Sequence, residues 1–375
     1  MKISSAFDAG NIEIVSLFDP ENIELKIRKD SAADFFQWFY FRIQEVKGLD
    51  LKINILNASE SAFPEGWIDY QAVVSYDRIT WFRVPTTYDG KKLIIEFMPE
   101  YNSVYLAYFV PYSHDQHLNL LSTAQMSPNA LLVNLGKTVE GRDLDMLVIG
   151  DDLDESKKRV WVIARQHPGE TMAEWFIEGF LSRLLDEHDP ISKKLLQKAV
   201  FYVVPNVNPD GSVHGNLRTN AAGENLNRAW ANPDVEKSPE VYHILKTMEL
   251  TGVDLNLDIH GDETLPYTFV SSIEGIPSYG KKLKMLDEKF SASWERITPD
   301  FQTQHGYPKN EAGKANLSIC SKAIGEKFKC LSMTIEMPFK DNANLPDEIF
   351  GWSAERSIRL GASVLHPIAE IMDDI

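Results

Sequence analysis

The stretch VWVIARQHPGETMAEWFIEGFLSRLL, residues 160–185, indicates the fold of the second part of the chain. It opens with a near-continuous apolar run, which is typical of a strand buried on both faces of a sheet. From Thr171 to Leu185 large apolar residues recur at helical spacing and predict a helix. Between the two stands Gln166–Glu170, QHPGE. An ordinary turn needs only a bend and a cap, so a histidine and a glutamate three positions apart indicate a functional site.

The same alternation of strand and helix continues along the chain. Residues 143–150, 198–209 and 253–261 are further near-continuous apolar segments, and residues 239–251 have the pattern of a helix. Alternation of this kind predicts an α/β domain with a mixed, mainly parallel sheet covered by helices on both faces. We expect this domain to occupy residues 112–375.

The first part of the chain has a different pattern. Up to Pro111 it consists of short segments rich in branched and aromatic residues, separated by turn signals such as Asp89-Gly90. No segment has helical length and period. These features predict an antiparallel β-sandwich domain at residues 1–111. Because no low-complexity linker follows it, we expect the two domains to pack tightly.

Composition excludes several classes of function. The 375 residues carry a net charge of −17, which argues against nucleic-acid binding and against attraction to anionic membranes. The N-terminus lacks the apolar core of a signal peptide, and no apolar run has membrane-spanning length. Two cysteines, Cys320 and Cys330, form no disulfide framework and are expected to be reduced. A cytoplasmic protein is predicted; the sequence leaves a homo-oligomer open.

Polar residues stand where several predicted strands end. His167 and Glu170 follow one strand, His260 ends another, and Glu336 ends a third. Ligands bind beyond the carboxyl ends of strands in open α/β sheets. A hydrolytic zinc site needs three protein ligands and an open fourth position, which His167, Glu170 and His260 could supply for one Zn²⁺ per chain. Each motif alone is weak, since Glu170 could simply interact with the positive end of the helix.

A loop-like region between these strands adds candidate substrate-binding residues. NPDGSVHGNLRTNAAGENLNRAW, residues 208–230, contains Arg218, Asn227 and Arg228 among glycines and asparagines. Arginines beside a metal can bind a carboxylate through two hydrogen bonds or polarise a carbonyl. Without a metal nearby they would be ordinary surface charges.

The motifs HPGE, NPDG, GNLRTN, NLNR, DIHG and TIE, in this order, resemble those of the M14 zinc carboxypeptidases. The similarity is greatest to the cytosolic carboxypeptidase subfamily, which is related to the tubulin deglutamylases, and within it to bacterial members. It covers nearly the whole chain and implies a β-sandwich domain followed by an α/β/α catalytic domain. The implied function is the hydrolysis of C-terminal residues, with glutamate as a candidate, from peptides or proteins.

Carried over position by position, the resemblance implies a role for each candidate. His167, Glu170 and His260 correspond to the zinc ligands. Glu336 corresponds to the general base that activates a zinc-bound water. Arg218 corresponds to the arginine that polarises the scissile carbonyl, and the pair Asn227 and Arg228 to the group that binds the terminal carboxylate of the substrate.

Two features depart from the family pattern. Relatives that remove glutamate carry a basic residue at a position nearest to Asn316 here, with Lys314 and Lys322 close by. Secreted members use a tyrosine in a mobile loop; Tyr307 lies in a suitable stretch, but we assign it no role because the cytosolic subfamily does not reliably keep that residue.

Two other functions are compatible with parts of the sequence. An N-acyl amino acid deacylase would use the same metal ligands, and its substrates also carry carboxylates. A binding module would use the sandwich to recognise a partner and the second domain as a scaffold. The complete set of ligands, base and arginines favours the peptidase.

Overall fold

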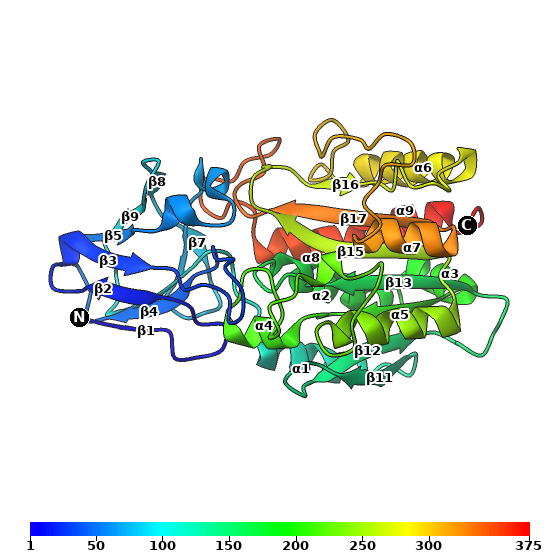
Figure 1. Cartoon of the computed structure of the whole chain (residues 1–375), viewed down its shortest axis with the longest axis horizontal. Helices are drawn as coiled ribbons and strands as arrows, with labels where there is room; N and C mark the ends of the chain where they lie inside the picture. The colour runs from blue at the N-terminus through cyan, green and yellow to red at the C-terminus, as the bar shows by residue number, and fades with distance from the viewer.

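The computed structural model describes residues 1–375 and confirms the predicted fold class. In Figure 1 the strands β1–β10 form one part of an elongated molecule, and α1–α9 with β11–β17 form the other. β10 ends at Ala107 and α1 begins at His114, so the boundary that we propose, after Pro111, falls in the segment between them.

The N-terminal part contains two five-stranded sheets. The first has the order β1 (Lys2–Ser4), β4 (Tyr40–Gln44), β10 (Ser103–Ala107), β6 (Val73–Ser75), β7 (Phe82–Arg83). The second has the order β2 (Glu13–Ser16), β3 (Ile23–Lys26), β5 (Leu51–Ile55), β9 (Leu93–Phe97), β8 (Thr86–Tyr88). Short 3-10 turns occur at η1 (Pro20–Asn22), η2 (Ala58–Glu60) and η3 (Pro64–Trp67). All pairings are antiparallel except that of β3 with β5, which is parallel.

The C-terminal part is built on a mixed seven-stranded sheet. Its order is β11 (Ala130–Lys137), β12 (Asp143–Ile149), β14 (Ala199–Val204), β13 (Lys158–Ala164), β15 (Leu255–Asp262), β17 (Leu331–Pro338), β16 (Phe269–Ser271). The four central strands run parallel, and β11, β12 and β16 are antiparallel to their neighbours. Every residue of β14, β15 and β17 is buried, as continuous apolar strands predict.

Helices cover both faces of this sheet. They are α1 (His114–Ala124), α2 (Met172–Leu184), α3 (Pro190–Lys198), α4 (Pro209–His214), α5 (Pro239–Thr251), α6 (Lys281–Ile297), α7 (Cys320–Phe328), α8 (Ala354–Ser363) and α9 (Leu365–Ile371). Apolar residues of α5 and α7 pack on one face, and those of α2, α3, α6, α8 and α9 on the other. None of the helices combines the length and the apolarity that crossing a membrane requires.

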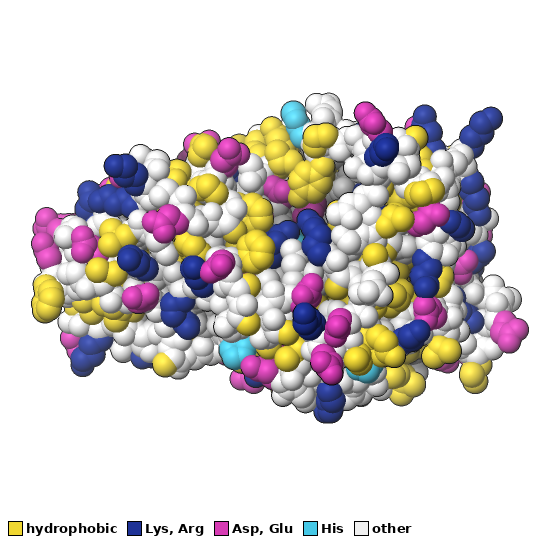
Figure 2. Space-filling view, in the orientation of Figure 1, with side chains coloured by type: hydrophobic (Ala, Val, Ile, Leu, Met, Phe, Trp, Pro, Cys, Tyr) yellow, Lys and Arg dark blue, Asp and Glu magenta, His cyan; other side chains and the backbone are white.

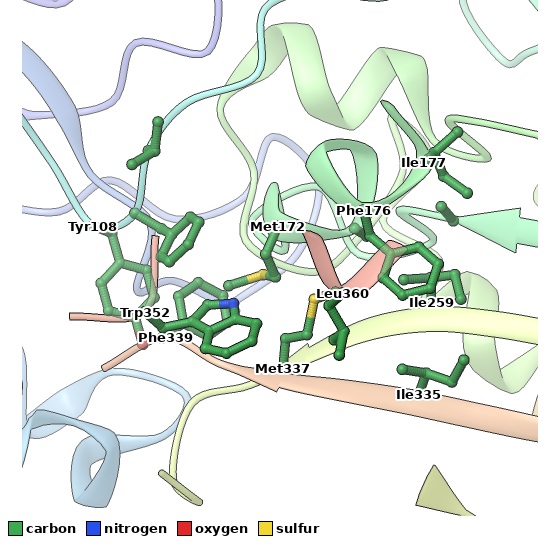
Figure 3. Close-up of a cluster of buried hydrophobic side chains, with 14 of the residues drawn as sticks. Tyr108, Met172, Phe176, Ile177, Ile259, Ile335, Met337, Phe339, Trp352 and Leu360 are labelled. Atoms are coloured by element: carbon green, nitrogen blue, oxygen red, sulfur yellow. The ribbon is translucent and has the colours of Figure 1, made fainter. Parts of the chain in front are cut away.

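The helix that follows QHPGE is held against α8 by two glycines. A Cβ added at Gly179 would lie 1.8 Å from the carbonyl oxygen of Ile358, and one at Gly361 would lie 1.9 Å from that of Phe176. The two backbones therefore approach more closely than any other residue would permit. Beside this crossing, side chains of α2, β17 and α8 form the buried cluster in Figure 3, which fixes α2 on the sheet. The predicted helix over 171–185 is confirmed to within a residue at each end.

Candidate active site

The three candidate metal ligands meet at the carboxyl ends of two neighbouring parallel strands. His167 and Glu170 lie in the loop from β13 to α2, and His260 lies in β15, which pairs with β13. All three are buried, and one ligand atom of each lies within 4.8 Å of the others. The Nδ1 atom of His167 is 2.6 Å from Glu170 Oε1, and that of His260 is 2.7 Å from Glu170 Oε2.

The other nitrogen of each histidine is bound to an oxygen. His167 Nε2 lies 3.1 Å from Asn225 Oδ1, and His260 Nε2 lies 3.0 Å from Asp258 Oδ1. In the tautomer that carries the proton on Nε2 and donates it to this oxygen, the Nδ1 lone pair of each histidine is available to a metal. Two imidazole nitrogens and a carboxylate with room for a further ligand are the donor set that zinc prefers.

A buried network behind His260 fixes its orientation. Gln166 Nε2 donates to both oxygens of Asp258, at 2.8 and 2.9 Å, and Gln166 Oε1 accepts from Trp230 Nε1 at 2.7 Å. Sequence reasoning missed Asp258, although its place two residues before His260 in a strand puts both side chains on the same face. Asp258 and Glu170 raise the pKa of His260 well above its usual value, although burial opposes this. The site therefore favours positive charge.

A second network supports the loop that carries His167. Arg165 has a φ of +57°, donates from Nε to the carbonyl oxygen of Pro168 at 3.0 Å, and forms an ion pair with the buried Glu174. His117 Nδ1 lies 2.9 Å from the same carboxylate. Burial alone would lower the pKa of His117, but its hydrogen bonds with Asp145 and Glu174 outweigh burial and raise the pKa to about 9.

Glu336 faces the ligands from the next strand. In the register of β15 and β17 it stands opposite His260, and only 6% of its surface is exposed. Its Oε2 atom is buried without a hydrogen-bond partner, which is unusual for a carboxylate. Burial raises the pKa of Glu336. An unpartnered oxygen beside a metal-ligand set is placed to accept a proton from a ligand or water.

The structure also brings Tyr307 to this point, where sequence reasoning had assigned it no role. Its hydroxyl donates to Asp262 Oδ2 at 2.5 Å and lies 3.3 Å from Glu336 Oε1, while 46% of the residue is exposed. Burial of the hydroxyl, together with the carboxylates of Glu336 and Asp262, raises the pKa of Tyr307 well above its usual value. Tyr307 therefore lines the site between Glu336 and the solvent.

The candidate substrate-binding residues line the same cleft. Asn227, in the short helix η4 (Leu226–Arg228), accepts from the backbone N–H of Cys320 at 2.9 Å, and its Nδ2 lies 3.4 Å from His260 Nε2. Arg228 donates to the carbonyl oxygen of Asn227 at 2.7 Å. Neither Arg218 nor Arg228 pairs with a carboxylate of the chain. Two unpaired guanidinium groups are therefore available to an anionic ligand.

The cleft that contains these groups has a volume of about 610 Å³. Its walls include the residues named above, the N-terminal residue Phe63, the acidic pair Asp262 and Glu263, and Lys322. Figure 2 shows basic and acidic side chains gathered at the middle of this face, where the two parts of the chain meet. Of the three residues considered for a basic pocket, Lys322 lines the cleft, whereas Lys314 and Asn316 are exposed outside it.

Lys322 contributes a buried ammonium group to the lining of the cleft. It lies in the first turn of α7, is 4% exposed, and donates from Nζ to the backbone oxygen of Ser272. Burial lowers its pKa to about 8, so the group is still mostly charged at neutral pH. One hydrogen bond leaves two of its three donors for another partner.

Other polar residues noted in the sequence have structural contacts. His214 pairs with Glu140 at 2.7 Å near the surface, and the ring of His305 stacks on Tyr267 at a centroid distance of 4.1 Å. The strand-end group Asn206, Asn208 and Asp210 is likewise engaged in buried hydrogen bonds, to Glu174, the Gln166 carbonyl and Thr138.

Comparison with known proteins agrees with this geometry. A model of the cytosolic carboxypeptidase N-terminal domain matches residues 3–109, and a model of zinc carboxypeptidases matches residues 118–357. The crystal structure of a metallo-carboxypeptidase from Burkholderia cenocepacia is 49% identical, with a TM-score of 0.97 and 100% of each chain covered. A metallo-carboxypeptidase from Pseudomonas aeruginosa, solved with (2-guanidinoethylmercapto)succinic acid, is 44% identical, with a TM-score of 0.98 and the same coverage.

Among longer relatives, cytosolic carboxypeptidase 1 of Danio rerio is 27% identical over 86% of this chain, and the match spans 32% of that protein. The resemblance inferred from the motifs is confirmed. The chain belongs to the zinc carboxypeptidase family and is a metallocarboxypeptidase that carries the N-terminal domain of the cytosolic carboxypeptidases.

Proposed function

We propose that the chain removes single residues from the C-termini of peptides or proteins and that it does so with one Zn²⁺ held by His167, Glu170 and His260. One observation carries the proposal: the three converging ligand atoms, the unpartnered Oε2 of Glu336 and two unpaired arginines share one cleft. When bound, Zn²⁺ supplies a Lewis acid that polarises a carbonyl and lowers the pKa of a water ligand to about 7.

Glu336 acts as the proton carrier of this reaction. Its Oε2 accepts a proton from the attacking water and later delivers it to the nitrogen of the leaving residue. The hydroxyl of Tyr307 lies 3.3 Å from the other oxygen, Oε1, which leaves Oε2 free for this transfer. The charge of the bound metal would lower the raised pKa of Glu336 and so favour the ionised form that a general base needs.

Asn227 and Arg228 determine that the enzyme acts at chain ends. The guanidinium of Arg228 can accept a carboxylate through two parallel hydrogen bonds, and Asn227 can donate a third. A peptide bond inside a chain offers no carboxylate at that position. Arg218, across the cleft, lies where it can polarise the carbonyl of the scissile bond and stabilise the negative charge that develops on it.

Lys322 suggests that the preferred terminal residue is acidic, with glutamate as the first candidate. Lys322 lines the cleft, and its ammonium has two free donors that a γ-carboxylate would satisfy. The ligand of the Pseudomonas aeruginosa protein instead carries a guanidinium group besides its carboxylates. A terminal lysine or arginine is therefore the competing substrate.

The test is a set of peptides that differ only in the last residue: Glu, Lys, Phe or Ala. Mass spectrometry of zinc-loaded protein should show stepwise loss of single residues, fastest for Glu, and none with Glu336→Gln or after chelation. In Lys322→Met the preference for Glu should fall by about 10-fold or more, the loss of a charge-assisted hydrogen bond, while Ala peptides are cleaved as before. Failure to shorten any peptide would contradict the proposal and direct the assay to N-acyl amino acids.

A further inference from the structure

We propose that Asp30, in the N-terminal part, is the positioning residue for Arg218, so that the N-terminal part is a component of the active site. This inference rests on the proposed role of Arg218. Asp30 Oδ1 accepts from the backbone N–H of Leu217 at 2.6 Å. Its Oδ2 accepts from the N–H of Arg218 at 3.0 Å, and from the N–H and hydroxyl of Thr219, both at 2.9 Å.

The carboxylate of Asp30 makes no other hydrogen bond. It is 5% exposed and forms no ion pair, so its charge is balanced by four hydrogen bonds from three consecutive residues. Successive backbone N–H groups that converge on one anion fix the dihedral angles of the segment that carries them. The backbone of Arg218 is thus set by a residue 188 positions earlier.

Neighbouring contacts tighten the same connection. The N–H of Ser31 donates to Asn216 Oδ1 at 3.0 Å, and Asn216 Nδ2 donates to Ser31 Oγ at 3.1 Å. Further along the loop, Gly223 has a φ of +80°, and a Cβ there would lie 2.3 Å from the carbonyl oxygen of Ala32. Residues 30–32 therefore contact the loop at two places, at residues 216–219 and at Gly223.

The head group of Arg218 also meets the N-terminal part. Its guanidinium carbon lies 5.1 Å from the centroid of the Phe63 ring, which forms a wall of the cleft. No carboxylate of the C-terminal part pairs with the side chain. The backbone N–H and the head group of Arg218 therefore both contact residues of the N-terminal part. Its own domain holds the loop at the flanking residues, where the N–H of Gly169 donates to the carbonyl oxygen of Leu217 at 2.9 Å and Asn220 Nδ2 donates to that of Lys237 at 2.8 Å.

A double-mutant cycle tests whether Asp30 acts through Arg218. Asp30→Asn keeps the shape but replaces one acceptor by a donor, and kcat/KM should fall on the order of 10- to 100-fold, mainly through kcat. Arg218→Ala should cost on the order of 100- to 1000-fold. If Asp30 acts through Arg218, the double variant is within about threefold of Arg218→Ala. If the kcat/KM losses of the two single variants multiply in the double variant, the proposal is overturned. Zinc content should equal that of the wild type in all three.

Arg83→Lys is the matched control. Arg83 is also a buried charge of the N-terminal part that crosses to the C-terminal part, but it donates to the carbonyl oxygens of Phe339 and Trp352. It should lower thermal stability while kcat/KM stays within about twofold of wild type, and its effect should multiply with that of Arg218→Ala. If Arg83→Lys lowers activity as much as Asp30→Asn, loosening of the interface is the cause and the proposal fails.

Hydrogen exchange supplies a readout that does not depend on activity. In Asp30→Asn, amides in the segment 213–222 should exchange at least about 10-fold faster, and in Arg83→Lys they should not. Unchanged exchange in Asp30→Asn would refute the proposal even if activity falls.

A second variant covers the case in which Asp30→Asn does not fold. Thr219→Val removes one of the four hydrogen bonds to Asp30, and its loss of activity, although smaller, must likewise not multiply with that of Arg218→Ala. A wild-type protein that cleaves no peptide would refute the proposed function, while exchange would still measure the hold on the loop.

Discussion

The proposed metal ligands and the arginines of the cleft are supported in different ways. The proposed ligands His167 and Glu170 follow the end of β13, and His260 lies in the adjacent strand β15. Asn225 and Asp258 of the same domain orient the two imidazoles. Arg218 lies on a loop whose backbone is bound by Asp30 of the other domain. One cleft therefore combines a proposed metal centre built within one domain with a proposed substrate site whose loop contacts both domains.

Removal of a ligand should have the largest effect, because it breaks the sheet-supported centre itself. Glu170→Ala takes away the carboxylate that both Nδ1 atoms face, so we expect dialysed protein to lose nearly all its zinc and its peptidase activity. Metal analysis and a peptide assay measure both. Glu178→Gln, in the helix α2 that follows this loop, should retain both, because Glu178 contacts Tyr112 instead. Full zinc occupancy in Glu170→Ala would contradict the assigned ligand set.

Removal of the base should leave the centre intact but stop the chemistry. In Glu336→Gln the amide cannot accept the proton from water, and kcat should fall on the order of 10³-fold with zinc content unchanged. KM should change little, because Glu336 does not hold the terminal carboxylate. Steady-state kinetics on a Glu-terminated peptide give the answer, and a residual kcat above about a tenth of wild type would assign the proton transfer elsewhere.

Loss of a carboxylate-binding group should act on the substrate site alone. Arg228→Ala removes the charge-assisted hydrogen bonds to the substrate's terminus, so KM should rise on the order of 10- to 100-fold. Peptides with an amidated C-terminus should be resistant to wild type and variant alike. If an amidated peptide were cleaved by the wild type, terminal-carboxylate recognition by Arg228 would be excluded.

A change behind a ligand should weaken the centre by a smaller amount. Asp258→Asn keeps the hydrogen bond to His260 Nε2 but removes the negative charge, so zinc affinity should fall by about 10-fold. Competition with a chelator of known affinity measures this. Asn256→Ser, in the same strand, should leave the affinity unchanged, since Asn256 bonds to Ser332 and not to a ligand.

The smallest effect concerns the network beneath the ligand loop. The folded-state pKa of His117, about 9, lies above its unfolded value of 6.5. Its stabilising contribution is therefore complete below pH 6.5 and is lost as the pH rises through 9, on the order of 3 kcal/mol in all. The free energy of unfolding should fall between pH 7 and 10 in wild type, and less steeply in His117→Gln. Equal slopes would show that His117 is not the titrating group.

The β-sandwich and α/β domains could be predicted from the sequence, because burial of one or both faces of a strand dictates whether apolar residues alternate with polar ones or run continuously. The apolar segment 35–44 has the composition of one continuous strand, but β4 begins only at Tyr40. Phe36, Trp38 and Phe39 are buried without strand pairing, and apolarity cannot distinguish the two situations. The strand β11 was missed because its residues are mostly part-exposed, which weakens the apolar signal.

The candidate site was predictable where short spacing places residues at strand ends, as for His167, Glu170, His260 and Glu336. Tyr307 could not be assigned, because its hydroxyl reaches Glu336 only through the path of a long loop. The sequence likewise could not show that Lys322, and not Asn316, lines the cleft. Both lie near the start of α7, and only the direction of the helix decides which side chain enters the cleft.

Local spacing, burial pattern and residue chemistry were enough to identify the family and to predict a metal-ligand set and a base. Only the tertiary structure decided what holds Arg218. Asp30 is one acidic residue among 55 Asp and Glu in the chain. Its role arises from hydrogen bonds across 187–189 positions. Such contacts leave no periodic trace in sequence, because they are formed by domain packing and are satisfied by backbone N–H groups that every residue except proline carries.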